Sequence, residues 1–193
     1  MTTSARLPPR LVTVLITLAC VVLAAVGIRV SEPDDNFQVV RGTVGAPVSL
    51  NEGEVMVSDV RVGDSLFEDG DVTSRTAGMF VAVHVTGAAP DREKLVLGSA
   101  RLLSGDRVYL PYTLTNLTVV PGFQTSLDLV FEVDPAGIEG LTLELWRGEV
   151  VVGYHQRVRV PLGFTRRSLA DWRNQAHRPI VEPEIYGETS VIG

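Results

Sequence analysis

Histidines are the first residues in this chain that could take part in chemistry. His84 and His155 each lie in a run of β-branched residues that predicts a strand. Two imidazoles can share a metal ion, but the sequence sets no acidic residue at ligand spacing from either one. Each histidine is therefore predicted to be a strand residue that faces solvent or makes a single hydrogen bond.

An acidic, glycine-bearing segment, Glu68-Asp69-Gly70-Asp71, could offer oxygen ligands to a calcium ion. Its spacing differs from that of an EF-hand, which places ligands at alternate positions over a loop of about twelve residues. We interpret the segment as a polar loop.

The sequence also lacks the motifs that usually surround a catalytic nucleophile. The chain has no Gly-x-Ser-x-Gly elbow and no glycine-rich phosphate loop, and its one cysteine, Cys20, lies in an apolar run near the N-terminus. The rest of the chain can therefore form no disulfide, thiolate nucleophile or cysteine metal site. We predict no catalytic residue, no metal and no cofactor, and we expect that the protein is not an enzyme.

The charge distribution argues against nucleic-acid binding. The formal net charge is −6, and the first 30 residues hold three arginines and no acid. The remaining residues therefore carry 14 Lys or Arg against 23 Asp or Glu, a balance of −9. A domain this acidic is repelled by phosphate backbones.

The N-terminal region has the pattern of a membrane anchor. Residues 1–10 are polar and basic, and residues 11–28 carry no charge. Eighteen helical residues span roughly 27 Å, close to the hydrocarbon thickness of about 30 Å. Basic residues before this run and acidic residues after it predict a cytoplasmic N-terminus and an extracytoplasmic remainder. We predict a single-pass protein of the cell membrane, with residues 11–30 as a signal anchor that contacts the lipid bilayer through residues 11–28.

Two other fates of this segment stay open. Ala25-Val26-Gly27 offers small residues at the spacing that a signal peptidase uses, which would release a cleaved protein. Cys20 could also be lipidated, although Thr17 occupies the position where a lipoprotein has a branched apolar residue.

Strand patterns dominate the chain after an acidic linker at residues 31–36. Short period-two or β-branched runs recur, with turn residues between them and no βαβ rhythm, over residues 37–164. This pattern favours an all-β fold, an antiparallel sandwich of two sheets. The predicted strands are Phe37–Val44, Val48–Leu50, Glu54–Val62, Met79–Gly87, Ala100–Leu103, Val108–Leu110, Thr125–Val133, Leu141–Trp146 and Val150–Val160.

Residues 42–147 resemble a known family, the immunoglobulin-like extracytoplasmic domain of unknown function found on lipoproteins and membrane-anchored proteins of Gram-positive bacteria. The resemblance implies an immunoglobulin-like sandwich, and it implies no catalytic residue. One departure is Gly87-Ala88-Ala89-Pro90, where the family has an Asn-rich turn. The matching motifs are Gly45-x-Pro47-Val48-x-Leu50, Gly78-Met79-Phe80-Val81-Ala82-Val83, Pro121-Gly122 and Val130-Phe131-Glu132-Val133-Asp134-Pro135.

Residues 165–193 are predicted to form a short helix and an extended tail. Ser168 followed by Asp171 has the pattern of a capping box, so a helix from about Leu169 to His177 is expected before Pro179. A helix this short needs a surface: its own sandwich, another protein or the membrane. The residues proposed to dock on a partner are Arg166, Arg167, Leu169, Trp172 and Arg173.

Two loop segments, Tyr109–Tyr112 and Val119–Phe123, place aromatic residues beside prolines. They either recognise a partner or cover the end of the sandwich. Together these features predict a membrane-anchored, extracytoplasmic module that mediates protein–protein interaction, for which a role as an accessory subunit of a cell-envelope assembly is one form. The alternative is an extracytoplasmic domain that binds or senses a small ligand or an ion.

Overall fold

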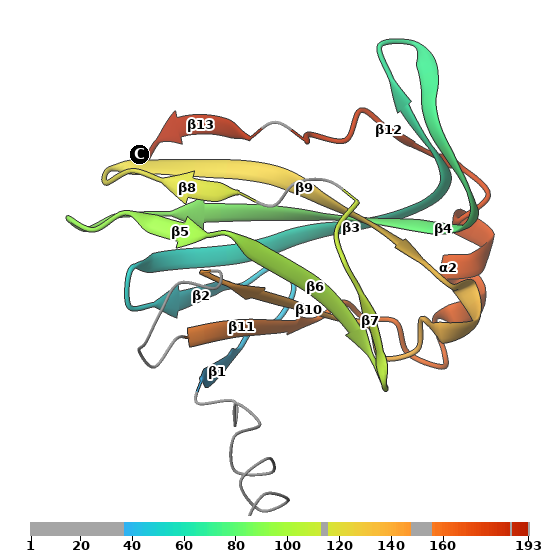
Figure 1. Ribbon diagram of the computed structural model, residues 1–193, viewed down its shortest axis with the longest axis horizontal. Helices are drawn as coiled ribbons and strands as arrows, with labels where there is room; N and C mark the ends of the chain where they lie inside the picture. Colours follow the sequence, from blue (N-terminus) through green and yellow to red (C-terminus); the bar gives the residue numbers. More distant parts are fainter. Residues whose placement is uncertain (1–36, 113–115, 148–155, 186, 193) are drawn as a thin grey trace, which may run out of the picture. The chain divides into compact units, whose positions relative to one another are not determined.

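Alternating apolar residues build two facing sheets in the computed structural model, which describes residues 37–112, 116–147, 156–185 and 187–192. We call the five-stranded sheet A and the six-stranded sheet B (Figure 1). Sheet A runs, in order, β1 (Gln38–Arg41), β11 (Gln156–Pro161), β10 (Thr142–Trp146), β6 (Ser99–Ser104) and β7 (Arg107–Tyr109). Its neighbours are antiparallel except β1, which pairs parallel to β11.

Sheet B includes both long strands of the chain and two strands from the C-terminal tail. Its order is β12 (Pro179–Val181), β3 (Gly53–Glu68), β4 (Asp71–Ala88), β9 (Phe123–Val133) and β13 (Glu188–Val191), with β2 (Pro47–Leu50) also paired to β3. Strands β5 (Leu95–Leu97) and β8 (Leu117–Val119) form a separate pair. The helical elements are a 3-10 turn, η1 (Pro135–Gly137), and the helix α2 (Leu169–Gln175).

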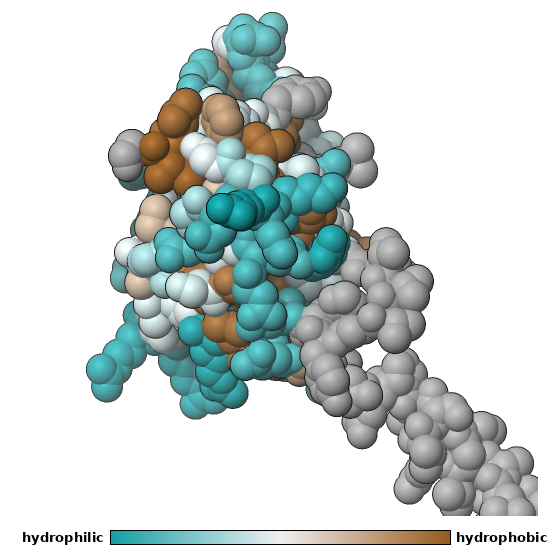
Figure 2. Space-filling model, turned by 90° about the vertical axis from the view of Figure 1, so that its left-hand side faces the viewer, coloured by the Kyte–Doolittle hydropathy of each residue, from teal (hydrophilic) through white to brown (hydrophobic). Residues whose placement is uncertain are grey.

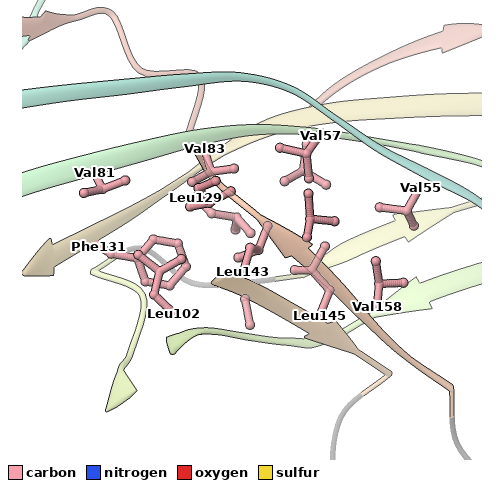
Figure 3. Close-up of a cluster of buried hydrophobic side chains, with 14 of the residues drawn as sticks. Val55, Val57, Val81, Val83, Leu102, Leu129, Phe131, Leu143, Leu145 and Val158 are labelled. Carbon is pink, nitrogen blue, oxygen red and sulfur yellow. The ribbon is translucent and has the colours of Figure 1, made fainter. Parts of the chain in front are cut away.

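The core lies between sheets A and B. Alternate residues of β4 and β9 face alternate residues of β6, β10 and β11 across it, and all are buried (Figure 3). The predicted period-two pattern thus produces a β-sandwich, because burying one face of each sheet removes its apolar side chains from water. The facing residues include Val81, Val83, Leu129 and Phe131 from sheet B and Leu102, Leu143, Leu145 and Val158 from sheet A.

The strands β3 and β4 continue into a hairpin where the sequence predicted a loop. Their register extends to Glu68 opposite Asp71, and the turn residues Asp69 and Gly70 both have positive φ, at 52° and 87°. An Asp-Gly pair with two positive φ values is the favoured two-residue hairpin turn. The β4 arm of this hairpin carries mostly exposed residues, so it lacks the apolar alternation that reveals a half-buried strand.

The boundaries of the other predicted strands agree with the structure or differ from it by a few residues. The Ser104-Gly105-Asp106 turn joins β6 to β7, as expected, and β10 pairs with β11. Sequence reasoning missed β5, β8, β12 and β13, which are only three or four residues long.

The helix α2 begins at Leu169 as predicted, but the capping box is absent. Ser168 makes no side-chain cap to the helix, and its hydroxyl donates to the carbonyl oxygens of Gly163 and Thr165. The Ser168 hydroxyl therefore stabilises the turn before the helix and does not cap the helix itself.

The predicted membrane anchor at residues 11–28 lies outside the described residues. Within the described ranges, no helix combines the length and the hydrophobicity needed to cross a membrane.

Candidate functional site

His84 is a strand residue that makes a hydrogen bond, one of the two outcomes that the sequence left open. Its Nδ1 lies 3.0 Å from Oδ1 of Asp128, in the register pair that joins β4 to β9. His155, the other histidine proposed on a strand, lies outside the described residues. Among the side chains that the structure describes, no three His, Cys, Asp or Glu residues converge as a metal-binding group.

Asp128 is a buried acid on the outer face of sheet B, since it alternates along β9 with the core residues Leu127 and Leu129. Only 2% of the residue is exposed. Its carboxylate accepts hydrogen bonds from the Arg61 guanidinium and from the backbone N–H of Glu184, at 2.7 Å in the second case. Its own N–H donates to the Glu184 carbonyl oxygen at 2.7 Å. Asp128 therefore fixes the C-terminal tail to β9 by both its side chain and its backbone.

The tail fastened by Asp128 covers part of the outer face of sheet B. β12 pairs parallel to β3, β13 pairs antiparallel to β9, and Arg61 also donates to the Val181 carbonyl oxygen at 3.1 Å. Ile180 joins a second, smaller apolar cluster with Leu66, Phe80, Ala82 and Val130. In the tail that the sequence predicted to be extended, Pro179–Val181 and Glu188–Val191 thus pair with the sandwich as strands of sheet B.

The predicted docking helix lies against its own sandwich. Trp172 stacks on the buried Phe164, with ring centroids 4.6 Å apart, and Leu169 packs on the core beside it. Arg166 is largely exposed and pairs with Glu139 at 2.7 Å, while Arg173 donates to the Pro135 carbonyl oxygen. Arg167 is exposed. The two apolar members of the predicted set therefore contact the core, and its arginines lie at the surface.

Both proline-flanked loops expose apolar side chains. In the Tyr109–Tyr112 segment, Leu110 and Tyr112 are exposed, and the Tyr112 ring also packs edge-on against Phe80 with centroids 5.5 Å apart. Its backbone is also fixed, because the Tyr112 N–H donates to the Val130 carbonyl oxygen at 2.6 Å. Tyr112 therefore covers part of the sandwich through its contact with Phe80, while Leu110 lies at the surface.

The Val119–Phe123 segment contributes to an exposed apolar patch, which we call the end patch. It consists of Val120, from the turn between β8 and β9, Phe123, the first residue of β9, and Val191, from β13. Their exposed fractions are 51%, 36% and 69%, and the Ile192 N–H donates to the Gly122 carbonyl oxygen at 3.1 Å, joining the tail to the turn. Figure 2 looks onto this end of the molecule and shows apolar surface gathered in its upper half.

The end patch lies beside an open strand edge. β13 is the last strand of sheet B in the described residues, and its four residues are all exposed. Its sequence, Glu-Thr-Ser-Val, contains no proline or lysine of the kind that blocks pairing at an edge. Sequence reasoning had identified the loop half of this surface, but not Val191, because only the folded tail brings residues 120 and 191 together.

Comparisons with known proteins do not indicate a function for this chain. No protein-family model matches the chain, and no curated protein matches it. Three solved structures are similar in fold. The yjhA protein from Bacillus subtilis has a TM-score of 0.47 and 13% identity over 61% of this chain and 98% of its own.

A candidate lipoprotein of Bacillus subtilis, ycdA, has a TM-score of 0.43 and 18% identity over 64% of this chain and 40% of its own. An uncharacterised β-sandwich protein from Clostridium difficile 630 has a TM-score of 0.42 and 7% identity over 64% of this chain and 95% of its own. Likeness at this level carries no functional argument, so the assignment of function rests on the surfaces of this molecule.

Proposed function

We propose that this protein is a non-enzymatic, membrane-anchored module that binds an extended segment of another cell-envelope protein through the end patch and the β13 edge. The observation that carries the proposal is that the exposed end patch and the open edge of β13 lie side by side. Exposed apolar side chains supply buried area on binding, and an open strand edge supplies backbone hydrogen bonds. The uncharged run at residues 11–28 supports the anchor.

We also propose that the sandwich is immunoglobulin-like. In that fold, the first, second and fifth strands share one sheet, and the third, sixth and seventh share the other. The neighbours β3, β4 and β9 fit the first group, and β6, β10 and β11 fit the second. The chain changes sheet between β4 and β6, between β7 and β9, and between β9 and β10, which fits a Greek-key arrangement.

The helix α2 fits the docking role less well than the end patch. Trp172 and Leu169 already pack on the core, so binding a partner through them would first expose the surface that they cover. Val120 and Val191 are exposed as they stand. A partner strand that pairs with β13 can place alternate side chains beside them.

Site-specific photo-crosslinking in native membranes tests the proposal. A photoreactive residue at position 191 of the full chain is expected to give one discrete product, and mass spectrometry should place the cross-link in an extended segment of an envelope protein. Val120→Asp should abolish that product, because a charge in the patch must be desolvated when the partner binds.

The control is a photoreactive residue at position 108, since Val108 is 52% exposed and lies on β7 of sheet A. It should give no such product. Identical products from both positions, a lipid adduct alone, or no product at positions 120, 123 and 191 would count against the proposal.

A further inference from the structure

A row of charged side chains crosses the outer face of sheet A. The register pairs Arg41 with Arg159, Arg159 with Glu144, and Glu144 with Arg101, on four neighbouring strands. Their sequence neighbours Leu143, Val158, Val160 and Leu102 are in the core, so the charged row lies on the opposite face. Three arginines therefore share one row with a single acid.

Glu144 is the fixed centre of this row. None of its surface is exposed. Its Oε1 accepts from Arg159 Nε at 2.7 Å, and its Oε2 accepts from Arg101 Nε at 2.6 Å. Arg157 approaches Oε2 at 3.5 Å. A buried carboxylate held by several guanidinium groups also holds those groups in place, so their orientations are set before any ligand arrives.

All three arginines that contact Glu144 also lie near an aromatic ring. The Arg157 guanidinium lies 3.6 Å from the Phe37 ring centroid and 5.1 Å from that of Trp146, although its Nε is buried without a hydrogen-bond partner among the described residues. Arg101 lies 5.3 Å from the Trp146 centroid, and Arg159 lies 5.7 Å from the Phe37 centroid.

Arg41 is different. In the described part of the chain it makes no ion pair and no side-chain hydrogen bond, yet it stands directly opposite Arg159. Like charges that face each other across neighbouring strands are destabilising. An anion between the two guanidinium groups would remove that repulsion.

A hollow lies where such an anion would bind. Its volume is about 370 Å³, within the range of small-molecule sites. Arg41 and Arg159 line it together with the Thr142 hydroxyl side chain, and the described lining residues include no acid. Leu103 and Pro161, the register partners of Thr142 on either side, add an apolar wall.

We propose that this hollow binds a phosphate ester, with the phosphoryl group between Arg41 and Arg159 and the organic part against Leu103 and Pro161. Two guanidinium groups balance a group with a charge of about −1.5 to −2, which a phosphate monoester has near pH 7 and a carboxylate does not. The planar forks of the arginines suit phosphate oxygens. A soluble phosphate monoester and a lipid whose head group is a phosphate monoester share this chemistry.

Calorimetric titration of the full chain in phosphatidylcholine nanodiscs tests the site. Glycerol 3-phosphate is expected to bind saturably, and more tightly than inorganic phosphate. Arg41→Gln should weaken binding at least about tenfold, the effect of one lost charge-assisted hydrogen bond. Thr142→Asp places a negative charge in the wall and should have the same effect by repulsion. Arg92→Gln, at an exposed position of another loop, is the matched control and should bind as the wild type does.

Nanodiscs that contain phosphatidic acid, whose head group is a phosphate monoester, then separate the two sources. Weaker apparent binding of the soluble ester in these discs assigns the lipid head group as the natural occupant, and unchanged binding assigns a soluble ester. The proposal is overturned if no saturable binding occurs, if acetate at the same ionic strength binds equally well, or if Arg41→Gln and Arg92→Gln lose affinity alike.

Discussion

Glu144 shows at the residue scale how a polar position in a strand becomes buried. It alternates with Leu143 and Leu145, which reach the core, so its side chain lies on the opposite face. It is nevertheless fully covered, because arginines from both neighbouring strands fold over it. Two-residue periodicity identifies the face of a side chain but not what packs above it.

Removing the charge of Glu144 is expected to destabilise the fold strongly. Glu144→Gln leaves three arginines around a neutral amide, and breaking a buried ion pair in this way costs about 3–5 kcal/mol. Denaturant unfolding followed by tryptophan fluorescence measures the loss. Glu139→Gln is the control, since Glu139 pairs with the largely exposed Arg166 and should cost no more than about 1 kcal/mol. Equal losses in the two variants would contradict the structural role given to Glu144.

Asp134, at the N-terminus of η1, makes a contribution to folding stability that depends on pH. The Ala136 backbone N–H and the Arg107 guanidinium hold the pKa of its carboxyl below the ordinary range. Because the folded-state pKa is lowered, the stabilisation is present above the unfolded-state pKa of about 3.9 and is lost as the pH falls through the folded-state value.

Asp134→Asn should therefore be less stable than the wild type at pH 7, and the gap in unfolding free energy should narrow as the pH falls below about 4. Urea denaturation at a series of pH values measures the gap. A gap that is constant from pH 7 to pH 3 would show that the carboxylate charge contributes nothing at this position.

The helix α2 is held at the element scale by packing rather than by its own sequence. Seven residues are too few for a stable isolated helix, and Ser168 provides no side-chain cap. The Phe164–Trp172 stack supplies the contact that its local sequence lacks.

Trp172→Ala should consequently melt α2 and destabilise the domain, by an amount near the lower end of the roughly 3–5 kcal/mol typical of large aromatic truncations, since the side chain is only partly buried. Arg167→Ala, at an exposed position next to the helix, should change stability by less than about 0.5 kcal/mol. Thermal unfolding monitored by circular dichroism compares the two. If Trp172→Ala were as stable as Arg167→Ala, α2 would not depend on this stack.

The C-terminal tail depends on one carboxylate. Asp128→Asn weakens the charged bonds from Arg61 and His84 and the bond from the Glu184 N–H. Hydrogen exchange at the Glu184 and Glu188 amides should accelerate at least about tenfold, because a hydrogen bond to a charged group contributes about 1.5–3 kcal/mol.

The matched control for the tail is Glu132→Gln. Glu132 lies on the same face of β9, and its carboxylate accepts from Thr76 rather than from the tail. Its substitution should leave exchange in residues 184–191 unchanged. Acceleration by both substitutions would indicate a general loosening of β9 instead of release of the tail.

The whole molecule is expected to be stable without any covalent cross-link. The single cysteine of the chain is Cys20, which precedes the compact unit Phe37–Gly193. A unit of this size buries enough apolar surface to fold without disulfides. Its melting temperature should therefore be the same with and without a reducing agent in calorimetry, and a drop on reduction would imply a cross-link between chains.

The fate of the N-terminal segment is a second prediction at this scale. An uncleaved anchor predicts a membrane-bound protein whose intact mass includes residues 1–30. A mass that begins after Gly27 would instead indicate a cleaved signal peptide, and an added lipid mass on Cys20 would indicate a lipoprotein.

The sequence by itself determined the strand-rich composition of the fold, most of the core strands and the start of α2. Those features follow from local patterns: side chains that alternate along a strand, and turn residues that the backbone requires. Leu127, Leu129 and Phe131 share the face that the pattern assigned to them.

Only the tertiary structure decided which polar residues are buried and which surfaces are open. Asp128 and Glu144 are covered by partners 13 to 67 positions away in the chain, and the end patch joins a turn to a tail strand far along the sequence. Short strands such as β12 and β13 carry too few residues for a periodic signal, and they form because the edges of sheet B offer unpaired backbone groups. Periodicity records which face a residue occupies, whereas burial and exposure depend on contacts between distant segments.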